Sequence, residues 1–285
     1  MESKKSKIKS IFKGGSKTYY YSSLFFPKNV RKDVSILYSF VRKADDFVDD
    51  VPQRVDEFYD FKGSYERALN GGSSGDIVID SFIDLQERMG FDEGWIEAFL
   101  HSMELDIIKN RYETIEELKE YLYGSAEVIG LMMAKILDLP EGSYKSARYL
   151  GRAMQYINFI RDIEEDLYLN RQYFPLKDMK KFDLYSLEYE ETHVKKDAFK
   201  AFVKEQVGRY YDWQDKAEAG FHYIPRRYLI PIKTASDMYK WTARGIMLNP
   251  NIVYYKKLKP SKFRIFNNGI RNVFYSRRRY GNIKS

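Results

Sequence analysis

The sequence lacks cysteine altogether and has only three histidines, which are scattered at His101, His193 and His222. Without a thiol, the chain can form neither a disulfide framework nor a thiolate-bound zinc or iron–sulfur site, and it has no cysteine nucleophile. The scattered histidines form no metal-binding motif. Any metal must therefore be bound by oxygen ligands.

Hydrophobic runs of about 18 residues or more are also absent from the sequence, so we expect no transmembrane helix. The lysine-rich beginning does not lead into the apolar stretch of a signal peptide. A chain without cysteine is compatible with a reducing compartment. We therefore expect a cytoplasmic protein that is either soluble or peripheral on the inner face of the membrane.

Prolines are few, and most of the eight fall where helices should begin or end. Apolar residues recur at three-to-four spacing, and no alternation of period two lasts long enough to predict a sheet. The pattern predicts helices over residues 28–50, 53–69, 76–89, 92–110, 114–137, 143–168, 191–219 and 227–248. Because no repeat or change of composition divides the chain, we predict one all-α domain over residues 1–285.

Charge is unevenly distributed along the chain. Residues 1–17 carry a net charge of +5 and residues 251–285 carry +10, which leaves −8 for residues 18–250. This pattern differs from the even basic face of a nucleic-acid binder, and we expect no nucleic-acid partner. The basic ends, 1–15 and 256–285, are either solvated tails or segments that attract an anionic surface such as a lipid bilayer or diphosphate groups.

A dense acidic motif ends the first expected helix, with the sequence Arg42-Lys43-Ala44-Asp45-Asp46-Phe47-Val48-Asp49-Asp50. Residues four apart share a helix face, so Asp45 stands over Asp49 and Asp46 stands over Asp50. Four like charges near a helix C-terminus repel one another and oppose the helix dipole. The motif is either a solvated helix end or a set of Mg²⁺ ligands that also bridge to a substrate phosphate, and we favour the second interpretation.

A second acidic motif repeats this logic on another expected helix, with the sequence Asn158-Phe159-Ile160-Arg161-Asp162-Ile163-Glu164-Glu165-Asp166. Asn158, Asp162 and Asp166 are spaced at i, i+4 and i+8 and form one polar stripe. Arg161 and Arg171 offer guanidinium groups that suit phosphate oxygens. We predict that the two stripes face each other across a cavity and hold divalent ions together with the diphosphate of a substrate.

The two motifs belong to a series of blocks in a fixed order, which are residues 16–27, 37–50, 121–126, 155–166 and 170–175. In order and spacing, over roughly residues 15–250, these blocks resemble the squalene/phytoene synthases, which are head-to-head prenyltransferases. The Asp-Asp-Phe-Val-Asp-Asp form of residues 45–50 resembles phytoene synthases more than the eukaryotic squalene synthases, which usually end in a membrane anchor.

The resemblance implies an isoprenoid-synthase helical bundle whose central cavity accepts two allylic diphosphates. It also implies that Mg²⁺, or Mn²⁺ in its place, draws diphosphate from one substrate. The double bond of the second substrate attacks the resulting cation, and a cyclopropylcarbinyl diphosphate forms, ionises again and rearranges.

Site residues follow from matching the blocks residue by residue. The catalytic carboxylates implied in this way are Asp45, Asp49, Asp162 and Asp166. The implied metal ligands are Asp45, Asp49, Asn158 and Asp162, supported by Asp46, Glu165 and Asp166. Besides Arg171, the expected substrate-binding residues are Ser16, Lys17, Thr18, Tyr38, Arg42, Gln155 and Arg161.

The substrate remains open between two chain lengths. We prefer a phytoene synthase that joins two C20 geranylgeranyl diphosphates without a reductant. The alternative is a C30 enzyme that makes dehydrosqualene from farnesyl diphosphate, or squalene if NADPH reduces the final cation. A non-catalytic binding or assembly protein of the same fold is a third interpretation. The oligomeric state is not predicted.

Other features fit a tunnel for an apolar, cationic intermediate. The 25 tyrosines and 19 phenylalanines provide aromatic faces that can stabilise a carbocation, although they also suit ordinary core packing. Ala126, Gly130 and Ala134 form a stripe of small residues, which predicts either close helix packing or room for an isoprenoid chain. Glu127 departs from the Val-Ala-Gly that is more usual in the family, so the cavity shape near it is uncertain from the sequence.

Overall fold

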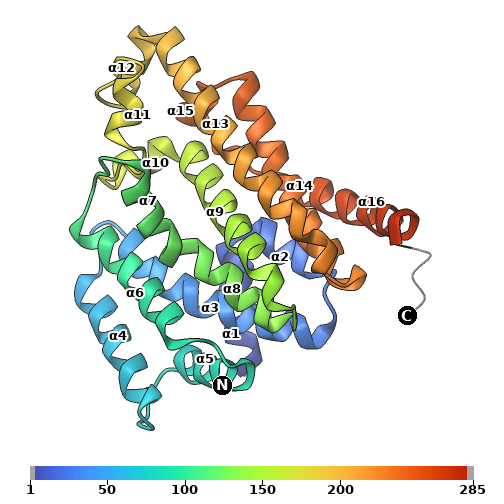
Figure 1. Cartoon of the computed structure of the whole chain (residues 1–285). Coiled ribbons are helices and arrows are strands. Elements are labelled where there is room, and N and C mark those ends of the chain that lie inside the picture. Colours follow the sequence, from blue (N-terminus) through green and yellow to red (C-terminus); the bar gives the residue numbers. More distant parts are fainter. Residues whose placement is uncertain (1–3, 281–285) are drawn as a thin grey trace.

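The protein is described by a computed structural model that covers residues 4–280, and within this range it is helical with no strand (Figure 1). The first half consists of α1 (Lys4–Gly15), α2 (Lys17–Ser23), α3 (Lys28–Asp49), α4 (Val55–Leu69), α5 (Ile77–Met89), α6 (Glu93–Ile108), α7 (Ile115–Leu122), the π-helical turn η1 (Tyr123–Glu127) and α8 (Val128–Ile136). The second half consists of η2 (Glu141–Ser143), α9 (Tyr144–Arg161), α10 (Ile163–Tyr168), α11 (Leu176–Lys180), α12 (Tyr189–Val194), α13 (Lys196–Glu218), η3 (Ala219–Tyr223), α14 (Arg226–Leu248), α15 (Ile252–Tyr255) and α16 (Lys262–Tyr280). The predicted all-α class is confirmed.

Local capping explains why several helices begin near their predicted positions. The side chains of Asp76, Asp92 and Thr114 each accept a hydrogen bond from a backbone N–H in the first turn of α5, α6 and α7. Such side-chain acceptors satisfy N–H groups that have no partner inside the helix. Gly90 ends α5 in the left-handed conformation, with φ of 59°, which glycine adopts without a steric penalty.

Two predicted helices differ from the observed ones. The helix expected over 143–168 is interrupted at Asp162, whose φ of −106° and ψ of 17° separate α9 from α10. The helix expected over 191–219 begins only at Lys196, because a short helix, α12, precedes it and ends at Val194. Both breaks lie inside continuous helical periodicity, which therefore gave no signal for them.

The sequence left the basic ends open between solvated tails and segments that attract an anionic surface, and the structure shows a helix in the described part of each end. Residues 4–15 form α1, where Ile8 and Phe12 are buried against α3. Residues 262–280 form α16, which packs on α2 and α14. A few apolar residues on one side of a short lysine-rich helix can pack it against the core, and the charge content of the segment does not predict this packing. Residues 1–3 and 281–285 lie outside the described structure.

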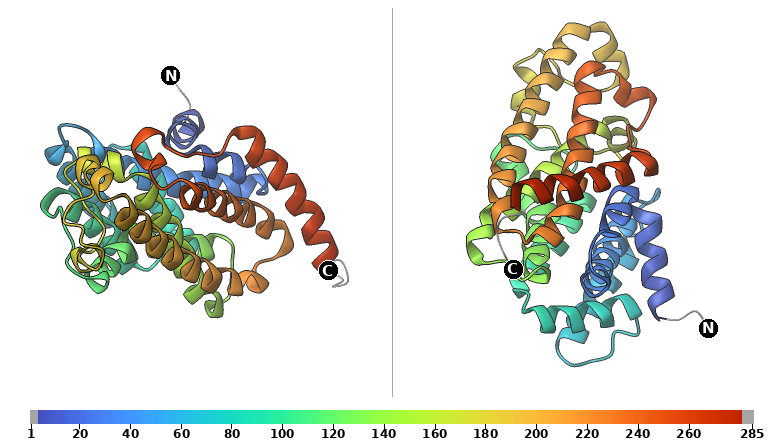
Figure 2. Two further views of the ribbon diagram at one scale, coloured as in Figure 1. Left: turned by 90° about the horizontal axis from the view of Figure 1, so that it is seen from above. Right: turned by 90° about the vertical axis from the view of Figure 1, so that its right-hand side faces the viewer.

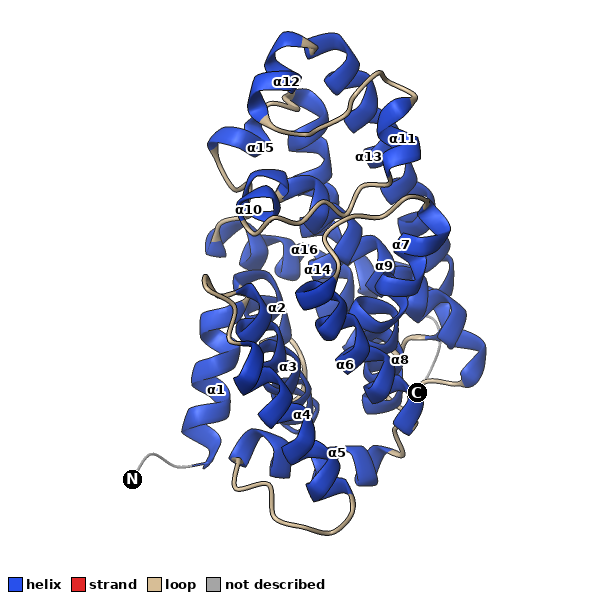
Figure 3. Cartoon of the chain, turned by 90° about the vertical axis from the view of Figure 1, so that its left-hand side faces the viewer, coloured by secondary structure: helices blue, strands red, loops and turns tan. Residues whose placement is uncertain are grey.

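Two apolar clusters make up the core. One joins α1 and α3–α6 with α8, and the other joins α7, α9 and α13 with the segments that follow α10. Figure 2 shows the bundle from two further sides, and in Figure 3 α4 and α5 lie at one end of it and α11 and α12 at the other. No helix within residues 4–280 is long and apolar enough to cross a membrane.

Helices α8 and α9 approach each other closely through two glycines. A Cβ atom on Gly130 would lie 2.3 Å from the carbonyl oxygen of Ala147, and one on Gly151 would lie 2.2 Å from that of Ala126. Only glycine fits at such distances. The predicted stripe of Ala126, Gly130 and Ala134 therefore serves close helix packing, and the same three residues also line a cavity.

Candidate active site

Apolar side chains enclose an elongated cavity of about 260 Å³ between the two halves of the bundle. Its lining follows one side of α9 from Ser146 to Asn158, a span of roughly 18 Å at the helical rise of about 1.5 Å per residue. Most of the wall is aliphatic or aromatic, and the polar residues Tyr38, Gln155 and Asn158 gather near the C-terminal end of α9. The cavity is thus an apolar tunnel with a polar mouth.

The first acidic motif lies on α3 beside this mouth. Burial and the nearby charge of Asp49 raise the pKa of Asp45, although Arg42 offsets part of the effect. Arg42 bridges to Asp45 at 3.0 Å and to Asp46 at 2.5 Å, so one guanidinium serves two carboxylates. Asp45 therefore has only a share of one guanidinium to balance its charge.

The other face of the motif, which carries Asp46 and Asp50, also has basic partners. Asp50 binds Arg54 at 2.7 Å, and Asp46 shares Arg42. Burial raises the pKa of Asp46, while Arg42 lowers it. Each face therefore has one carboxylate on the shared Arg42 and one carboxylate with an arginine of its own, which is Arg54 for Asp50 and Arg171 for Asp49.

Arg171 connects the first motif to a buried network. Its side chain, which is 5% exposed, donates to Asp49 at 2.7 Å and to the carbonyl oxygen of Val48. Asp106 on α6 lies behind it and accepts hydrogen bonds from Tyr121 at 2.7 Å and Tyr173 at 2.8 Å. Burial raises the pKa of Asp106 to about 6, and Arg171 limits the rise.

The second acidic motif lies at the end of α9 and in α10. Arg161 contacts Asp162 through two nitrogens, at 2.7 and 2.5 Å. Lys257, from the segment between α15 and α16, bridges to Asp162 at 3.2 Å and also binds Glu165. Although Asp162 separates α9 from α10, the backbone N–H groups of Asp162 and Asp166 still donate to the carbonyl oxygens of Asn158 and Asp162 at 2.8 Å, so the predicted spacing of the stripe is kept.

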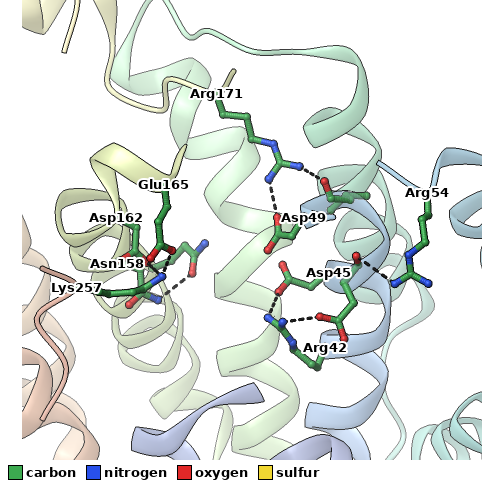
Figure 4. A network of polar contacts seen from close by, with 12 residues as sticks. Arg42, Asp45, Asp49, Arg54, Asn158, Asp162, Glu165, Arg171 and Lys257 are labelled. Carbon is green, nitrogen blue, oxygen red and sulfur yellow. Dashed lines mark hydrogen bonds and ion pairs between the residues drawn. The ribbon is translucent and has the colours of Figure 1, made fainter. Parts of the chain in front are cut away.

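The two motifs meet at the mouth of the cavity. Figure 4 shows Asp45 and Asp49 on one side and Asn158, Asp162 and Glu165 on the other, with Arg171 reaching Asp49 from above. Burial and then the negative charges of Asp162 and Asp49 raise the pKa of Asp166. Asp166 is thus near enough to both motifs to interact with their charges. The mouth therefore concentrates oxygen ligands from α3, α9 and α10.

These oxygen ligands suit a hard divalent cation. The buried Oδ1 atom of Asn158 has no hydrogen-bond partner in the described structure, so an acceptor is left free for a cation. Among the side chains that the structure describes, no three carboxylates or histidines form a ready-made metal cage. Mg²⁺ commonly binds through one or two carboxylates plus substrate phosphates, and carboxylates that lie apart on different helices suit this mode of binding.

The remaining predicted substrate-binding residues lie along α2 and α3. Ser16 caps α2 by accepting a hydrogen bond from the backbone N–H of Tyr19 at 3.3 Å. Thr18 is half-buried, and its carbonyl oxygen accepts from Ser22. Tyr38 lines the cavity, and burial raises the pKa of its phenol. The side chain of Lys17 lies outside the described residues. Of Ser16, Thr18 and Tyr38, the structure brings only Tyr38 to the cavity wall.

Several residues of the site were missed because no local pattern marks them. In the sequence, Asp106 was only one position of an expected helix, and Tyr239, on α14, belonged to no motif. Burial raises the pKa of Tyr239, and hydrogen bonds with Tyr19 and Asn158 lower it, which places its hydroxyl at the polar mouth. Lys259 joins Lys257 near Asp162, and burial together with the charge of Lys257 lowers its pKa. Only the basic character of residues 251–285 hinted at Lys259.

The uncertainty about Glu127 is resolved by its contacts. Its side chain is 1% exposed, does not line the cavity, and binds Arg148 at 2.7 Å and Arg152 at 2.5 Å. Both arginines belong to α9, so the carboxylate ties the π-helical turn to that helix. Glu127 therefore supports the tunnel wall from outside and leaves the lumen apolar.

Comparison with known proteins agrees with this geometry. A family model described as squalene/phytoene synthase matches residues 12–264. The 15-cis-phytoene synthase of Synechocystis is 28% identical over 258 residues, which cover 85% of this chain and 76% of that protein. The enzyme of the same name from Synechococcus elongatus is 26% identical over 258 residues, which cover 85% and 83% of the two chains.

Solved structures share the fold. A dehydrosqualene synthase bound to a ligand superposes with a TM-score of 0.84 at 22% identity, covering 95% of this chain and 96% of that one. A squalene synthase from Alicyclobacillus acidocaldarius superposes with a TM-score of 0.74 at 20% identity, covering 88% and 94%. The predicted helical bundle around a central cavity is thereby confirmed at the level of the fold.

Proposed function

Because the chain belongs to the squalene/phytoene synthase family and is a prenyltransferase, we propose that it condenses two molecules of geranylgeranyl diphosphate head to head to phytoene. One observation carries the proposal: two acidic motifs meet at one end of an apolar tunnel. A substrate with a long apolar chain and a highly charged diphosphate matches this arrangement, because its chain suits the tunnel and its diphosphate suits the polar end. The names of the cyanobacterial relatives favour the C20 substrate over the C15 one.

A divalent cation fits the mouth in this proposal. Mg²⁺, or Mn²⁺, would be held by the carboxylates and the free amide oxygen described above, and when bound it supplies positive charge that stabilises a departing diphosphate. The residues that would hold it are Asp45 and Asp49 on α3 and Asn158, Asp162 and Asp166 on the opposite side, with Asp46 and Glu165 in support.

The basic residues at the mouth would bind the diphosphates themselves. Arg42, Arg161 and Lys257 each lie against a carboxylate of the motifs, so they stand where phosphate oxygens would arrive. Guanidinium groups can bind such oxygens with two parallel hydrogen bonds. Arg171 is buried and holds Asp49, so we assign it to positioning this carboxylate rather than to direct contact with substrate.

The tunnel would protect the cationic steps. Phe12, Tyr19 and Tyr38 bring three rings together in its wall, with Phe12 and Tyr38 centroids 4.6 Å apart. Aromatic faces stabilise cations without donating an electron pair to form a bond. An apolar wall also excludes water, which would otherwise capture the carbocation. A cyclopropylcarbinyl diphosphate formed at the mouth could then ionise and rearrange before release.

The same proposal includes the setting of the protein. We propose a cytoplasmic enzyme that contacts the inner face of an anionic membrane through its basic ends, since residues 251–285 carry ten lysines and arginines and no acidic residue. A hydrocarbon product of this size is insoluble in water. A nearby bilayer would receive it.

Incubation of the purified protein with Mg²⁺ and geranylgeranyl diphosphate, followed by extraction and identification of the hydrocarbon, tests the proposal. We expect phytoene, and no product with EDTA or with the Asp45→Asn variant. Parallel reactions contain farnesyl diphosphate with and without NADPH. An exclusively C30 product would overturn the assignment of phytoene. No hydrocarbon from either diphosphate would instead support a non-catalytic protein of this fold.

A further inference from the structure

Helix α16 has an exposed apolar stripe that the active site does not use. Phe263, Phe266, Ile270 and Phe274 are spaced by three, four and four residues, so they lie on one face of the helix. Their exposed fractions are 75%, 55%, 39% and 57%. Three exposed phenylalanines on one helix face are unusual on a protein surface, because together they leave a large apolar area in water.

The opposite face of α16 holds the helix firmly on the bundle. Ile265 is fully buried, and Asn272 donates to Thr234 at 3.2 Å and to Asp237 at 3.0 Å, both on α14. At Gly269 an added Cβ would lie 2.2 Å from the ring of Phe25, so the helix packs closely on the turn after α2. The direction in which the apolar stripe points is therefore set by packing.

Basic side chains border the stripe. Arg264 lies over the ring of Trp241 at 4.6 Å, and Lys262 lies over that of Tyr21 at 5.2 Å. Arg271 is exposed on the same helix. Since residues 251–285 contain no acidic residue, nothing in this segment neutralises these charges locally. A surface that combines aromatic rings with unopposed positive charge matches the interface of an anionic bilayer.

The stripe also lies next to the wall of the tunnel. Phe266 contacts Phe25, with ring centroids 6.0 Å apart, and the neighbouring residues Ser22, Ser23 and Phe26 line the cavity. Figures 1 and 2 show α16 along the outside of the bundle, beside α2 and α14. One turn of chain therefore separates the tunnel from the exposed stripe.

We propose that α16 is a membrane-docking helix, which inserts Phe263, Phe266, Ile270 and Phe274 into the headgroup region of an anionic lipid bilayer. The positive charges beside the stripe attract the surface, and the rings then bury their apolar area. This inference deepens the proposed function, because a tunnel wall held against the bilayer offers a hydrocarbon product a short path into lipid. The docking itself does not depend on which diphosphate is the substrate.

Flotation of the full-length protein with vesicles tests the docking without any substrate. Vesicles of phosphatidylcholine with phosphatidylglycerol are compared with vesicles of phosphatidylcholine alone. We expect preferential binding to the anionic vesicles and a loss of about tenfold or more in the Phe263→Ser/Phe266→Ser variant. A matched control, Tyr185→Ser/Val194→Ser, removes two exposed apolar side chains near α12 and should bind as the unchanged protein does.

A charge variant keeps the test decisive if the double phenylalanine variant folds poorly. Arg264→Gln/Arg271→Gln should weaken binding to anionic vesicles and leave the weak binding to neutral vesicles unchanged. Equal flotation with both kinds of vesicle, or full binding by the Phe263→Ser/Phe266→Ser variant, would overturn the proposal. So would a dimer in sedimentation that this variant converts to a monomer, because a second copy of the chain would then cover the stripe.

An activity assay in detergent separates this inference from the proposed function. The Phe263→Ser/Phe266→Ser variant should form hydrocarbon from the diphosphate substrate at the normal rate, since neither residue lines the cavity. Failure of both proteins to make hydrocarbon would refute the proposed function and leave the flotation result standing. Normal activity without preferential flotation would refute the docking alone.

Discussion

Asp45, near the end of α3, and Asp178, in α11, are carboxylates packed among helices, with side chains 35% and 6% exposed, and their pKa values shift in opposite directions. Burial and the charge of Asp49 raise the pKa of Asp45. Burial alone would also raise the pKa of Asp178, but hydrogen bonds from Lys181 and Arg209 more than offset it and leave the pKa lowered. Each of these two partners lies 2.7 Å from the carboxylate.

The difference lies in the ratio of cations to carboxylates. At the cavity mouth, Asp45 and Asp46 share Arg42, whereas Asp178 has two basic partners of its own. Burial is therefore a poor guide to the role of a carboxylate, and the local balance of charge is a better one. An enclosed group of carboxylates with too few cations is arranged to receive one, and perturbed ionisation of this kind marks functional sites.

The strongest test of this comparison exchanges the carboxylates for amides at the mouth. We expect Asp45→Asn and Asp162→Asn to lower hydrocarbon formation at least about 100-fold, since each removes charge that the reaction needs. The free energy of unfolding should stay the same or rise in Asp45→Asn, because the charge of Asp45 is unfavourable where it lies. Product assays and urea denaturation measure the two effects. Unchanged turnover in either variant would contradict the assignment of the site.

The reverse pattern is expected at the second region. Asp178→Asn leaves Arg209 without its buried partner and should lower the free energy of unfolding by about 3 kcal/mol. Turnover per folded molecule should change little. Lys181→Gln is the control, since Lys181 is 54% exposed and its loss should cost less than about 1 kcal/mol. A large loss of turnover in folded Asp178→Asn would remove the distinction between the two regions.

The pH dependence of stability should also have opposite signs in the two regions. Asp106, whose pKa burial raises to about 6, favours the folded state below its usual pKa near 3.8 and loses that contribution as the pH rises through 6. The contribution of Asp178 is present above the usual pKa and is lost as the pH falls through its lowered value. Denaturation of Asp106→Asn and Asp178→Asn, each relative to the unchanged protein, from pH 3 to 7 should give opposite slopes. Slopes of the same sign would contradict these pKa shifts.

Glu127 sharpens the comparison, because it is buried beside the tunnel but fully paired. Glu127→Gln should lower the free energy of unfolding by about 2 kcal/mol, since Arg148 and Arg152 lose a buried partner while Arg148, 45% exposed, remains partly solvated. Turnover should fall far less than in Asp45→Asn. Glu120→Gln, at an exposed position of α7, is the matched control and should be neutral within about 0.5 kcal/mol. A large loss of turnover in Glu127→Gln would show that pairing with basic residues does not distinguish a structural carboxylate from a catalytic one.

Much of the local structure was predictable. Helix α3 spans Lys28–Asp49, against a prediction of 28–50, because its apolar residues keep helical spacing and Pro27 precedes it. The pairing of Asp45 with Asp49 on one face followed from the same spacing. The packing of the N-terminal segment was not predictable, since Ile8 and Phe12 are only two apolar residues in a lysine-rich segment and its average composition does not reveal them.

The sequence by itself determined the helices, the two acidic motifs and the family, because each depends on residues that are a few positions apart or on blocks in a fixed order. Only the tertiary structure decided that Arg171 meets Asp49, 122 residues away, and that Lys257 meets Glu165, 92 residues away. The same holds for the exposure of the aromatic stripe on α16. Such contacts depend on how helices pack against one another, and the period of a single helix carries no information about its partners.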